Sequence, residues 1–382
     1  MKSFHRQLAA LGLVATLCMT TGCAGQTAEE SSFSTPSSQS AVQEGESQMQ
    51  QTVENPNLAI RVPEGEDHYI FELDERVQRT QVYFTNRFGI ELAGDLYMAA
   101  DADPNGSYPA LVIGPPFGGV KEQGPGVYAN ELAQRGFVVL TFDPSYHGYS
   151  GGQPRYTGST ATYVEDFSAG VDFLGSLEYV DRERIGAIGI CGSGGFALSA
   201  ATMDPRIKAV APVVMYDIAG INNSMTGEAR QQMLEMAANQ RWADLESDTP
   251  QVNISYPEEP TDEVPEGLDE VTAEFYSFYG TSRGHHPNAL GNVTISSFPD
   301  LMTFPDLTHI SELNGRPVLF IAGENAHSRG YSEEAYAAAS EPKELYLVEG
   351  ANHVDLYDDV TKIPFDKLEE FFNTAMPAGQ EG

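Results

Sequence analysis

The chain has 382 residues, of which 55 are acidic and 21 are Lys or Arg, and its formal net charge at pH 7 is −34. This charge repels nucleic acid and anionic lipid headgroups, so we expect neither as a ligand. The length suits one large α/β domain with an insertion and leaves the oligomeric state open.

The N-terminus has the features of an export signal. A short basic start precedes an apolar run, residues 8–19, that is too short to span a membrane comfortably. Small residues then lead into Cys23, as in a bacterial lipobox, although Thr20 stands where that motif usually has Leu. We expect residues 1–22 to be a lipoprotein signal peptide and Cys23 to carry a lipid anchor, which places the protein in the bacterial cell envelope, facing outside the cytoplasm. A secretory signal cleaved elsewhere is the alternative.

Composition separates a tether from a folded domain. Residues 23–56 are rich in Ser, Gln and Glu and almost lack aromatic residues, which predicts a disordered tether behind the lipidated Cys. The folded domain is expected over residues 57–382. It contains a single cysteine, Cys191, so no disulfide forms within it.

Strand-like and helix-like segments alternate along this domain. Continuous apolar strands separated by helices predict an α/β fold with a mostly parallel central sheet and helices on both faces. The expected strands are 80–84 and 91–98 as an antiparallel pair, then 110–113, 137–142, 184–190, 209–215, 317–322 and 344–348; the expected helices are 126–135, 161–177, 194–203, 333–339 and 365–373.

One interval, residues 218–313, interrupts this alternation. It combines a predicted helix over 225–242 with a Pro-rich acidic loop and a dense aromatic patch. An insertion at this point of the fold lies over the carboxyl ends of the strands, so we interpret it as a cap. Tyr279, Arg283 and His286 are its candidate substrate-binding residues, since Arg283 can hold a carboxylate through two hydrogen bonds. No ligand spacing supports a metal site, and no cofactor is expected.

The candidate nucleophile is Cys191, in the segment Gly-Ile-Cys-Gly-Ser-Gly-Gly between a predicted strand and helix. Strand, sharp turn and helix with small residues around the central side chain form a nucleophile elbow. The helix dipole and a nearby His favour the reactive thiolate there. Two alternatives remain: a buried inert thiol, or Ser193 as nucleophile in a frame shifted by two residues.

The predicted partners of Cys191 follow three other strands. His353 comes directly after the last strand, where it can take and return a proton. The usual position of the triad acid holds Ala326, so Glu324 and Asp217 are the candidates, and a Cys–His pair without an acid is a third possibility.

Two backbone N–H groups are expected to form the oxyanion hole. One belongs to Gly192, directly after the nucleophile, and the other lies in the loop after strand 110–113. Because two prolines in that loop lack an N–H, Phe117 is the natural donor.

Four segments together resemble the dienelactone-hydrolase-like branch of the α/β-hydrolases. They are Gly-Gly-Val-Lys-Glu-Gln at 118–123, Phe-Asp-Pro-Ser-Tyr at 142–146, the elbow at 189–195 and Gly-Ala-Asn-His-Val-Asp-Leu-Tyr at 350–357. The resemblance implies hydrolysis of an ester, thioester, lactone or activated amide of a small molecule through an acyl group on Cys191. An acyltransferase on the same scaffold and a surface-anchored binding protein without activity are the alternatives.

Overall fold

The computed structural model describes residues 68–303 and 307–378. The predicted signal peptide, Cys23 and the tether lie outside these described residues. Within the described part of the chain, no helix is both long enough and apolar enough to cross a membrane.

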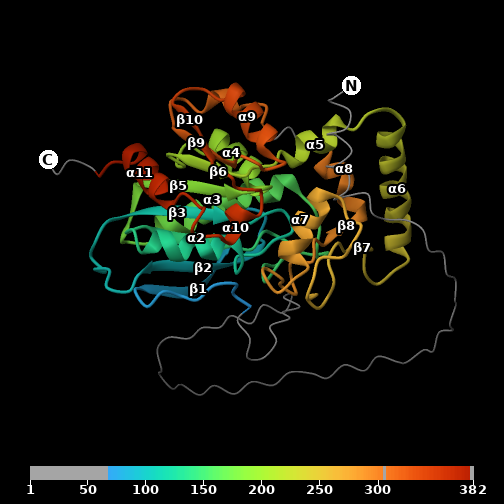
Figure 1. Ribbon diagram of the computed structural model, residues 1–382, viewed down its shortest axis with the longest axis horizontal. Helices are drawn as coiled ribbons and strands as arrows, with labels where there is room; N and C mark the ends of the chain where they lie inside the picture. The colour runs from blue at the N-terminus through green and yellow to red at the C-terminus, as the bar shows by residue number, and fades with distance from the viewer. Residues whose placement is uncertain (1–67, 304–306, 379–382) are drawn as a thin grey trace, which may run out of the picture.

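An eight-stranded sheet forms the centre of the molecule, in the order β1-β2-β4-β3-β5-β6-β9-β10 (Figure 1). β2 pairs antiparallel with β1 and with β4, and the remaining pairs are parallel. The carboxyl ends of the parallel strands share one edge, so the loops after them converge there. The strands are β1 (Val77–Thr85), β2 (Glu91–Ala99), β3 (Tyr108–Gly114), β4 (Val138–Phe142), β5 (Val180–Ile190), β6 (Val210–Val213), β9 (Val318–Gly323) and β10 (Lys343–Val348).

Helices cover both faces of the sheet because its central strands are apolar on both sides. On β3, Leu111 and Ile113 pack into one core, while Ala110 and Val112 pack into the other. The first core also holds side chains of α2 (Gly124–Ala133), α10 (Asp355–Asp358) and α11 (Phe365–Ala375), and the second those of α3 (Thr160–Ser176), α4 (Ser193–Met203) and α9 (Arg329–Ala338).

The predicted fold class, a mostly parallel sheet covered on both faces, is confirmed. One strand is longer than the sequence suggests: β5 begins at Val180, four residues before the predicted start. Its first part is polar and partly exposed, and the pairing with β3 shifts register between Tyr108 and Ala110. A hydrophobic pattern therefore finds only the buried half of this strand.

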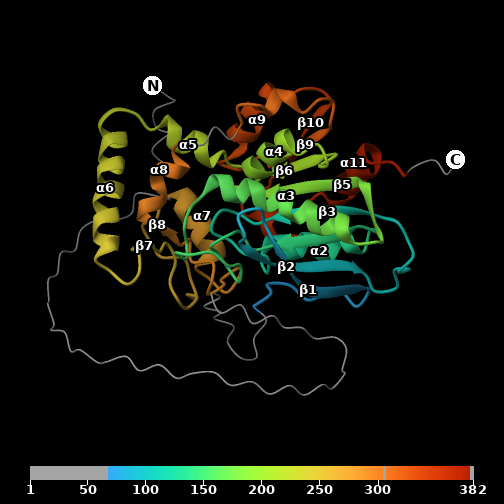
Figure 2. The same ribbon diagram turned by 180° about the vertical axis from the view of Figure 1, so that it is seen from behind.

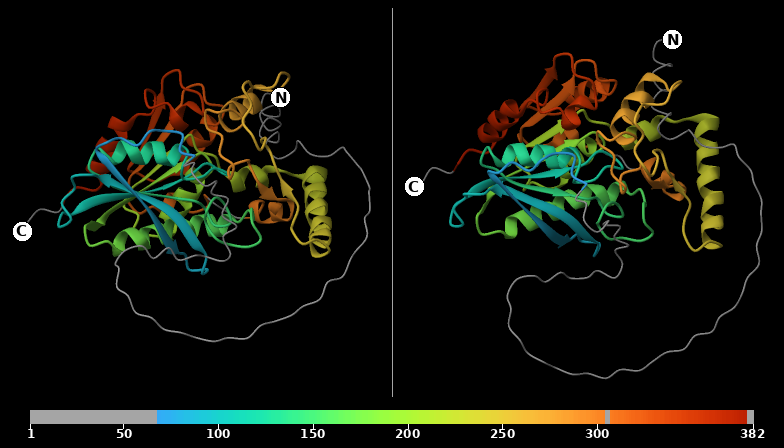
Figure 3. Two further views of the ribbon diagram at one scale, coloured as in Figure 1. Left: turned by 90° about the horizontal axis from the view of Figure 1, so that it is seen from below. Right: turned by 60° about the horizontal axis from the view of Figure 1, so that its bottom comes forward.

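The chain between β6 and β9 forms a cap that lies beyond one end of the strands of the sheet (Figures 1 and 2). The helix α6 stands at its outer margin in every view, and among its described side chains only Ala237 is buried (Figure 3). The cap contains α5 (Ile218–Ser224), α6 (Gly227–Leu245), β7 (Val252–Asn253), α7 (Glu270–Tyr279), β8 (Val293–Thr294), η1 (Ile295–Ser297), α8 (Phe298–Leu301) and η2 (Ile310–Glu312).

Candidate active site

The turn between β5 and α4 holds Cys191 in a left-handed conformation, with φ of 56°. Such a φ is uncommon for a residue with a side chain, and it makes the turn sharp enough to raise the sulfur above the sheet edge. The neighbouring glycines leave the necessary space, because a Cβ at Gly189 would collide with the backbone of Ser193. The Cys191 N–H donates to Val213 O on β6 (2.9 Å), which ties the turn to the sheet.

Ser193 does not face the same space as Cys191. Its hydroxyl donates to the carbonyl oxygen of Pro115, in the loop after β3, and its side chain is buried. It borders a separate small cavity, whereas Cys191 borders the main pocket. The alternative with Ser193 as nucleophile therefore does not fit this geometry.

Cys191 lies at a pocket of about 980 Å³, a volume that includes the space at its mouth. Among the described residues around it, none carries a charged side chain. The cap supplies most of the wall, and the sheet loops supply the floor. The lining residues are Phe117, Gly118, Cys191, Tyr216, Ile218, Ile221, Asn253, Ser255, Tyr256, Val271, Phe275, Tyr279, Gly291, Val293, Phe298, Leu301 and Tyr357.

The two predicted oxyanion-hole donors point at the Cys191 sulfur. The backbone N–H groups of Gly192 and Phe117 both favour the charged form of the sulfur and so act to lower the pKa of the thiol. The loop that carries Phe117 is fixed on its far side, where Asp143 accepts the N–H of Lys121 (2.8 Å). The cap also contacts this loop, because the Gln123 amide donates to Gly284 O.

The Cys191 thiol is nevertheless protonated at neutral pH. Burial raises its pKa to about 11, although hydrogen bonds from Tyr357, Gly192 and Phe117 act in the opposite direction. The resting thiolate expected from the sequence is therefore wrong for the empty site. The helix dipole and backbone donors do not compensate for removal of the sulfur from water.

His353 is fully buried and makes two hydrogen bonds through its ring. Its Nδ1 lies 2.6 Å from Ser328 Oγ, and its Nε2 lies 2.9 Å from the hydroxyl of Tyr357. Burial, and to a lesser degree the neighbouring His327, holds the pKa of His353 well below its usual range. The ring is therefore neutral at rest, and Tyr357 is a neighbour of both the ring and Cys191.

Neither predicted acid reaches His353. Glu324 accepts the N–H of Gly350 at the surface (3.0 Å), and Asp217 accepts the N–H of Gly220 (2.7 Å). Ser328, two residues past the position where an Asp was expected, is hydrogen-bonded to Nδ1 instead. Both acid assignments are corrected accordingly.

A carboxylate does approach His353, but from the cap. Glu274 on α7 accepts the N–H of Val354 with one oxygen (2.9 Å) and contacts His327 Nδ1 with the other (2.9 Å). The His327 ring lies against the His353 ring, with 4.7 Å between their centroids. Glu274 lies within the aromatic patch of the cap, where no sequence pattern marks a carboxylate as a neighbour of the catalytic loop. Tyr357 ends the segment 350–357, and Ser328 follows two residues after Ala326.

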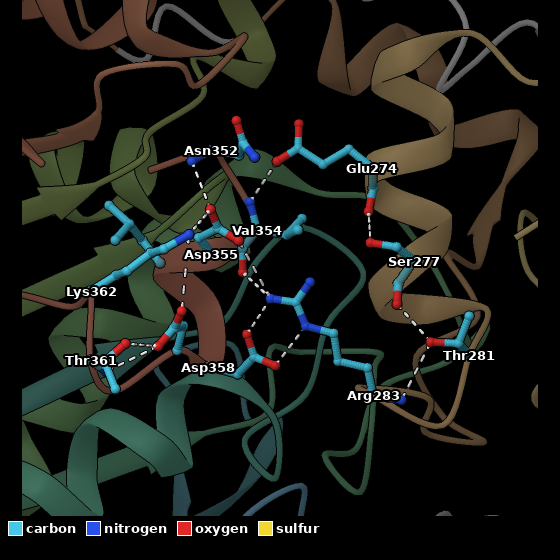
Figure 4. Close-up of polar contacts among 12 residues, drawn as sticks. Glu274, Ser277, Thr281, Arg283, Asn352, Val354, Asp355, Asp358, Thr361 and Lys362 are labelled. Atoms are coloured by element: carbon cyan, nitrogen blue, oxygen red, sulfur yellow. Dashed lines mark hydrogen bonds and ion pairs between the residues drawn. The ribbon is translucent and has the colours of Figure 1, made fainter. Parts of the chain in front are cut away.

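Arg283 links the cap to the loop that carries His353, and this corrects its predicted role in binding a substrate carboxylate. Its guanidinium binds Asp358 through two hydrogen bonds of 2.8 and 2.6 Å and also donates to Val354 O (3.2 Å). Figure 4 shows the guanidinium between Asp358 and Val354, with Glu274 reaching Val354 from α7. Arg283 therefore binds Asp358 and the backbone of Val354, and it does not line the pocket.

The other two cap candidates have different positions. Tyr279 lines the pocket, beside Tyr357 at a ring-centroid distance of 6.3 Å. His286 is fully buried away from the pocket, with Nε2 3.8 Å from a carboxylate oxygen of Glu122, so its predicted contact with substrate is corrected. Within the described residues, no group of three or more His, Cys, Asp or Glu side chains is arranged to hold a metal ion.

A mostly parallel sheet with a nucleophile elbow after β5 and a histidine after the last strand defines an α/β-hydrolase. Residues 74–229 match the model of the PET hydrolase-like family. The uncharacterized protein PA2218 of Pseudomonas aeruginosa is 49% identical over 79% of this chain and 82% of its own. Its crystal structure superimposes with a TM-score of 0.76, at 47% identity over 80% of this chain and 96% of that one. The chain therefore belongs to the α/β-hydrolase family that contains PA2218.

More distant relatives carry names that describe acyl chemistry. The acyltransferase drtE of Aspergillus calidoustus is 28% identical over 79% of this chain and 96% of its own. The thiohydrolase aneE of Aspergillus aculeatus is 27% identical over 73% of this chain and 88% of its own. The family thus includes proteins named for hydrolysis and proteins named for transfer.

Proposed function

We propose that the protein hydrolyses an ester or thioester through a covalent acyl group on Cys191. The observation that carries this proposal is the position of the sulfur: it borders an enclosed pocket, and two backbone N–H groups converge on it. When a substrate carbonyl approaches, N–H groups in this position can donate their hydrogen bonds to the oxygen of the tetrahedral intermediate. The relatives named as a thiohydrolase and an acyltransferase support the same class of chemistry.

In this mechanism His353 acts as general base for the thiol. The sulfur attacks the carbonyl carbon, the carbonyl electrons move to the oxygen held by Phe117 and Gly192, and the proton ends on His353. The same proton then goes to the leaving group as its bond to the acyl carbon breaks. A water molecule then attacks the acyl carbon, with His353 again as the base. The bond to the Cys191 sulfur breaks, the sulfur regains a proton from His353, and the acid is released. Each proton transfer of this kind typically contributes about 10²–10⁴-fold.

The pocket favours an uncharged, largely apolar acyl group. Its described lining has no charged side chain, and aromatic and aliphatic residues dominate it. Burying an ionised substrate there without a partner would be strongly unfavourable. The net charge of −34 also disfavours anionic substrates at the stage of approach.

The test is turnover of 4-nitrophenyl acetate and longer 4-nitrophenyl esters by the full chain and by two variants. Cys191→Ala is expected to lose at least about 10³-fold in kcat/KM because no nucleophile remains. Ser193→Ala is the matched control and is expected to stay within about tenfold, since its hydroxyl is turned away from the pocket. Turnover that survives Cys191→Ala would show that the proposal is wrong.

Acyl transfer is the second candidate, because the cap encloses an apolar pocket and drtE is named an acyltransferase. A transferase passes the acyl group to an alcohol or amine faster than to water. Product analysis with and without such acceptors separates the two activities. A constant yield of free acid at every acceptor concentration identifies a hydrolase. The absence of both products over a wide ester panel would favour a binding protein.

We also propose that Cys23 carries the lipid anchor of an envelope lipoprotein, on the basis of the sequence around it. In bacterial cells, the protein should fractionate with membranes and its N-terminal peptide should carry acyl chains by mass spectrometry. Cys23→Ala should abolish both. Membrane association that persists without acylation of Cys23 would contradict this assignment.

A further inference from the structure

Tyr357 is a neighbour of both the candidate nucleophile Cys191 and the candidate base His353. Its hydroxyl lies 2.9 Å from His353 Nε2, and Tyr357 lines the same pocket as Cys191, where its hydroxyl favours the charged form of the sulfur. Tyr357 lines the pocket, whereas His353 is fully buried and does not line it. A proton on its way from the pocket to the imidazole therefore meets the phenol first.

The surrounding hydrogen bonds indicate which atom donates in the contact between Tyr357 and His353. Ser328 Oγ lies 3.5 Å from Val214 O, which can only accept, so the serine hydroxyl donates there and accepts the proton on His353 Nδ1. This leaves the lone pair on Nε2 free to accept from the Tyr357 hydroxyl. At rest the sulfur is a neutral thiol, so the phenol oxygen can accept the thiol proton; Tyr357 would donate to the sulfur only if the sulfur were charged. Every donor in the series thus has an acceptor, from the sulfur to the carbonyl oxygen of Val214, directly after β6.

We propose that Tyr357 is a catalytic residue that relays protons between Cys191 and His353, an inference that rests on the proposed acyl chemistry. As the sulfur lone pair bonds to the substrate carbonyl carbon, the thiol proton moves to the phenol oxygen and the phenolic proton moves to Nε2. When the tetrahedral intermediate collapses, Nε2 returns a proton to the phenol and the phenol protonates the leaving group. Tyr357 ends each step as a neutral phenol, so no phenolate needs to accumulate.

The relay also fits the burial of His353. A buried neutral imidazole is protected from solvent by a ring of aromatic side chains, which includes Tyr216, Phe275 and Tyr357. Direct contact with a substrate leaving group would require this packing to open. Because the Tyr357 hydroxyl is a neighbour of both Cys191 and His353, protons can pass between them while the aromatic packing around His353 stays closed.

The experiment compares Tyr357→Phe with Tyr128→Phe in the full chain, using 4-nitrophenyl acetate. Tyr128, on α2, is the matched control. Its buried hydroxyl donates to the carbonyl oxygen of Leu356 (2.7 Å), the residue before Tyr357 in α10, but Tyr128 does not line the pocket. We expect Tyr357→Phe to reduce kcat about 100-fold or more with little change in KM. Tyr128→Phe should remain within about threefold. Melting temperatures establish that both variants are folded.

The proton count gives a second, independent readout. The rate of acylation is measured from the first-turnover release of nitrophenolate in mixtures of H2O and D2O. Two protons moving together give a curved dependence on the deuterium fraction in the wild-type chain, and Tyr357→Phe should remove the curvature. A folded Tyr357→Phe variant that acylates at the wild-type rate, or a linear dependence in the wild type, overturns the relay.

The same measurement separates the two proposals. If the wild-type chain is not acylated on Cys191 at all, by mass spectrometry, the proposed function fails and the relay fails with it. If the wild type is acylated and Tyr357→Phe is acylated equally fast, the acyl chemistry stands and only the relay is wrong.

Discussion

At the scale of single residues, the site combines a buried thiol with a buried imidazole, and both are neutral at rest. Burial raises the pKa of Cys191 to about 11 and lowers that of His353 well below its usual range. A pre-formed thiolate–imidazolium pair is therefore unfavourable in the empty site. The proton must leave the sulfur while the sulfur attacks, which is how a serine enzyme works and differs from a nucleophile held as a thiolate.

This difference predicts how the thiol reacts with an uncharged alkylating agent. Because the folded pKa lies above the ordinary value, the thiolate fraction should rise about tenfold for each pH unit between pH 6 and 10. Iodoacetamide labelling of the Cys191 peptide, followed by mass spectrometry, should therefore accelerate throughout this interval. A plateau at or below pH 8.5 would indicate a thiolate pair and contradict the buried neutral thiol.

At the scale of elements, the helix α7 has two roles. Its inner face lines the pocket with Val271, Phe275 and Tyr279. Its other contacts reach the loop after β10: Glu274 holds the N–H of Val354, and Arg283, just beyond the helix, holds Asp358 and Val354 O. The cap therefore also fixes the segment that contains both His353 and Tyr357 (Figure 4).

Arg283→Ala should consequently affect catalysis although its side chain does not line the pocket. Loss of the paired hydrogen bonds to Asp358 leaves a partly buried carboxylate without its main partner, at a cost of about 1–3 kcal/mol in stability. We expect kcat to fall more than KM rises, because the catalytic segment is displaced and the pocket is kept.

The matched control is Arg329→Ala, whose ion pair with Glu333 is largely solvated and contributes about 0.5 kcal/mol or less. Urea unfolding and steady-state kinetics of both variants make the comparison. Equal stability and equal kcat in the two variants would mean that the cap does not position the His353 loop.

At the scale of the whole molecule, the sequence predicts the architecture better than the chemistry. The sheet is predictable because apolar β-branched runs mark its buried strands, and the elbow is predictable because only small residues fit around Cys191. The partners of His353 are not. Glu274 reaches the site through the folding of the cap, and Ser328 replaces a carboxylate by lying near Nδ1, which no local pattern records. Long-range contacts of this kind depend on tertiary packing.

The burial of Cys191 has a further consequence for the lifetime of the protein. Thiolates attack peroxides and disulfides much faster than thiols do, so a sulfur that keeps its proton and lies beneath the cap is oxidised slowly. If the protein is exported, as the sequence around Cys23 predicts, the protonated and buried Cys191 needs no reductant beside it to resist oxidation. Burial lowers the fraction of reactive thiolate in the empty site, and the same burial slows oxidation of the sulfur between turnovers.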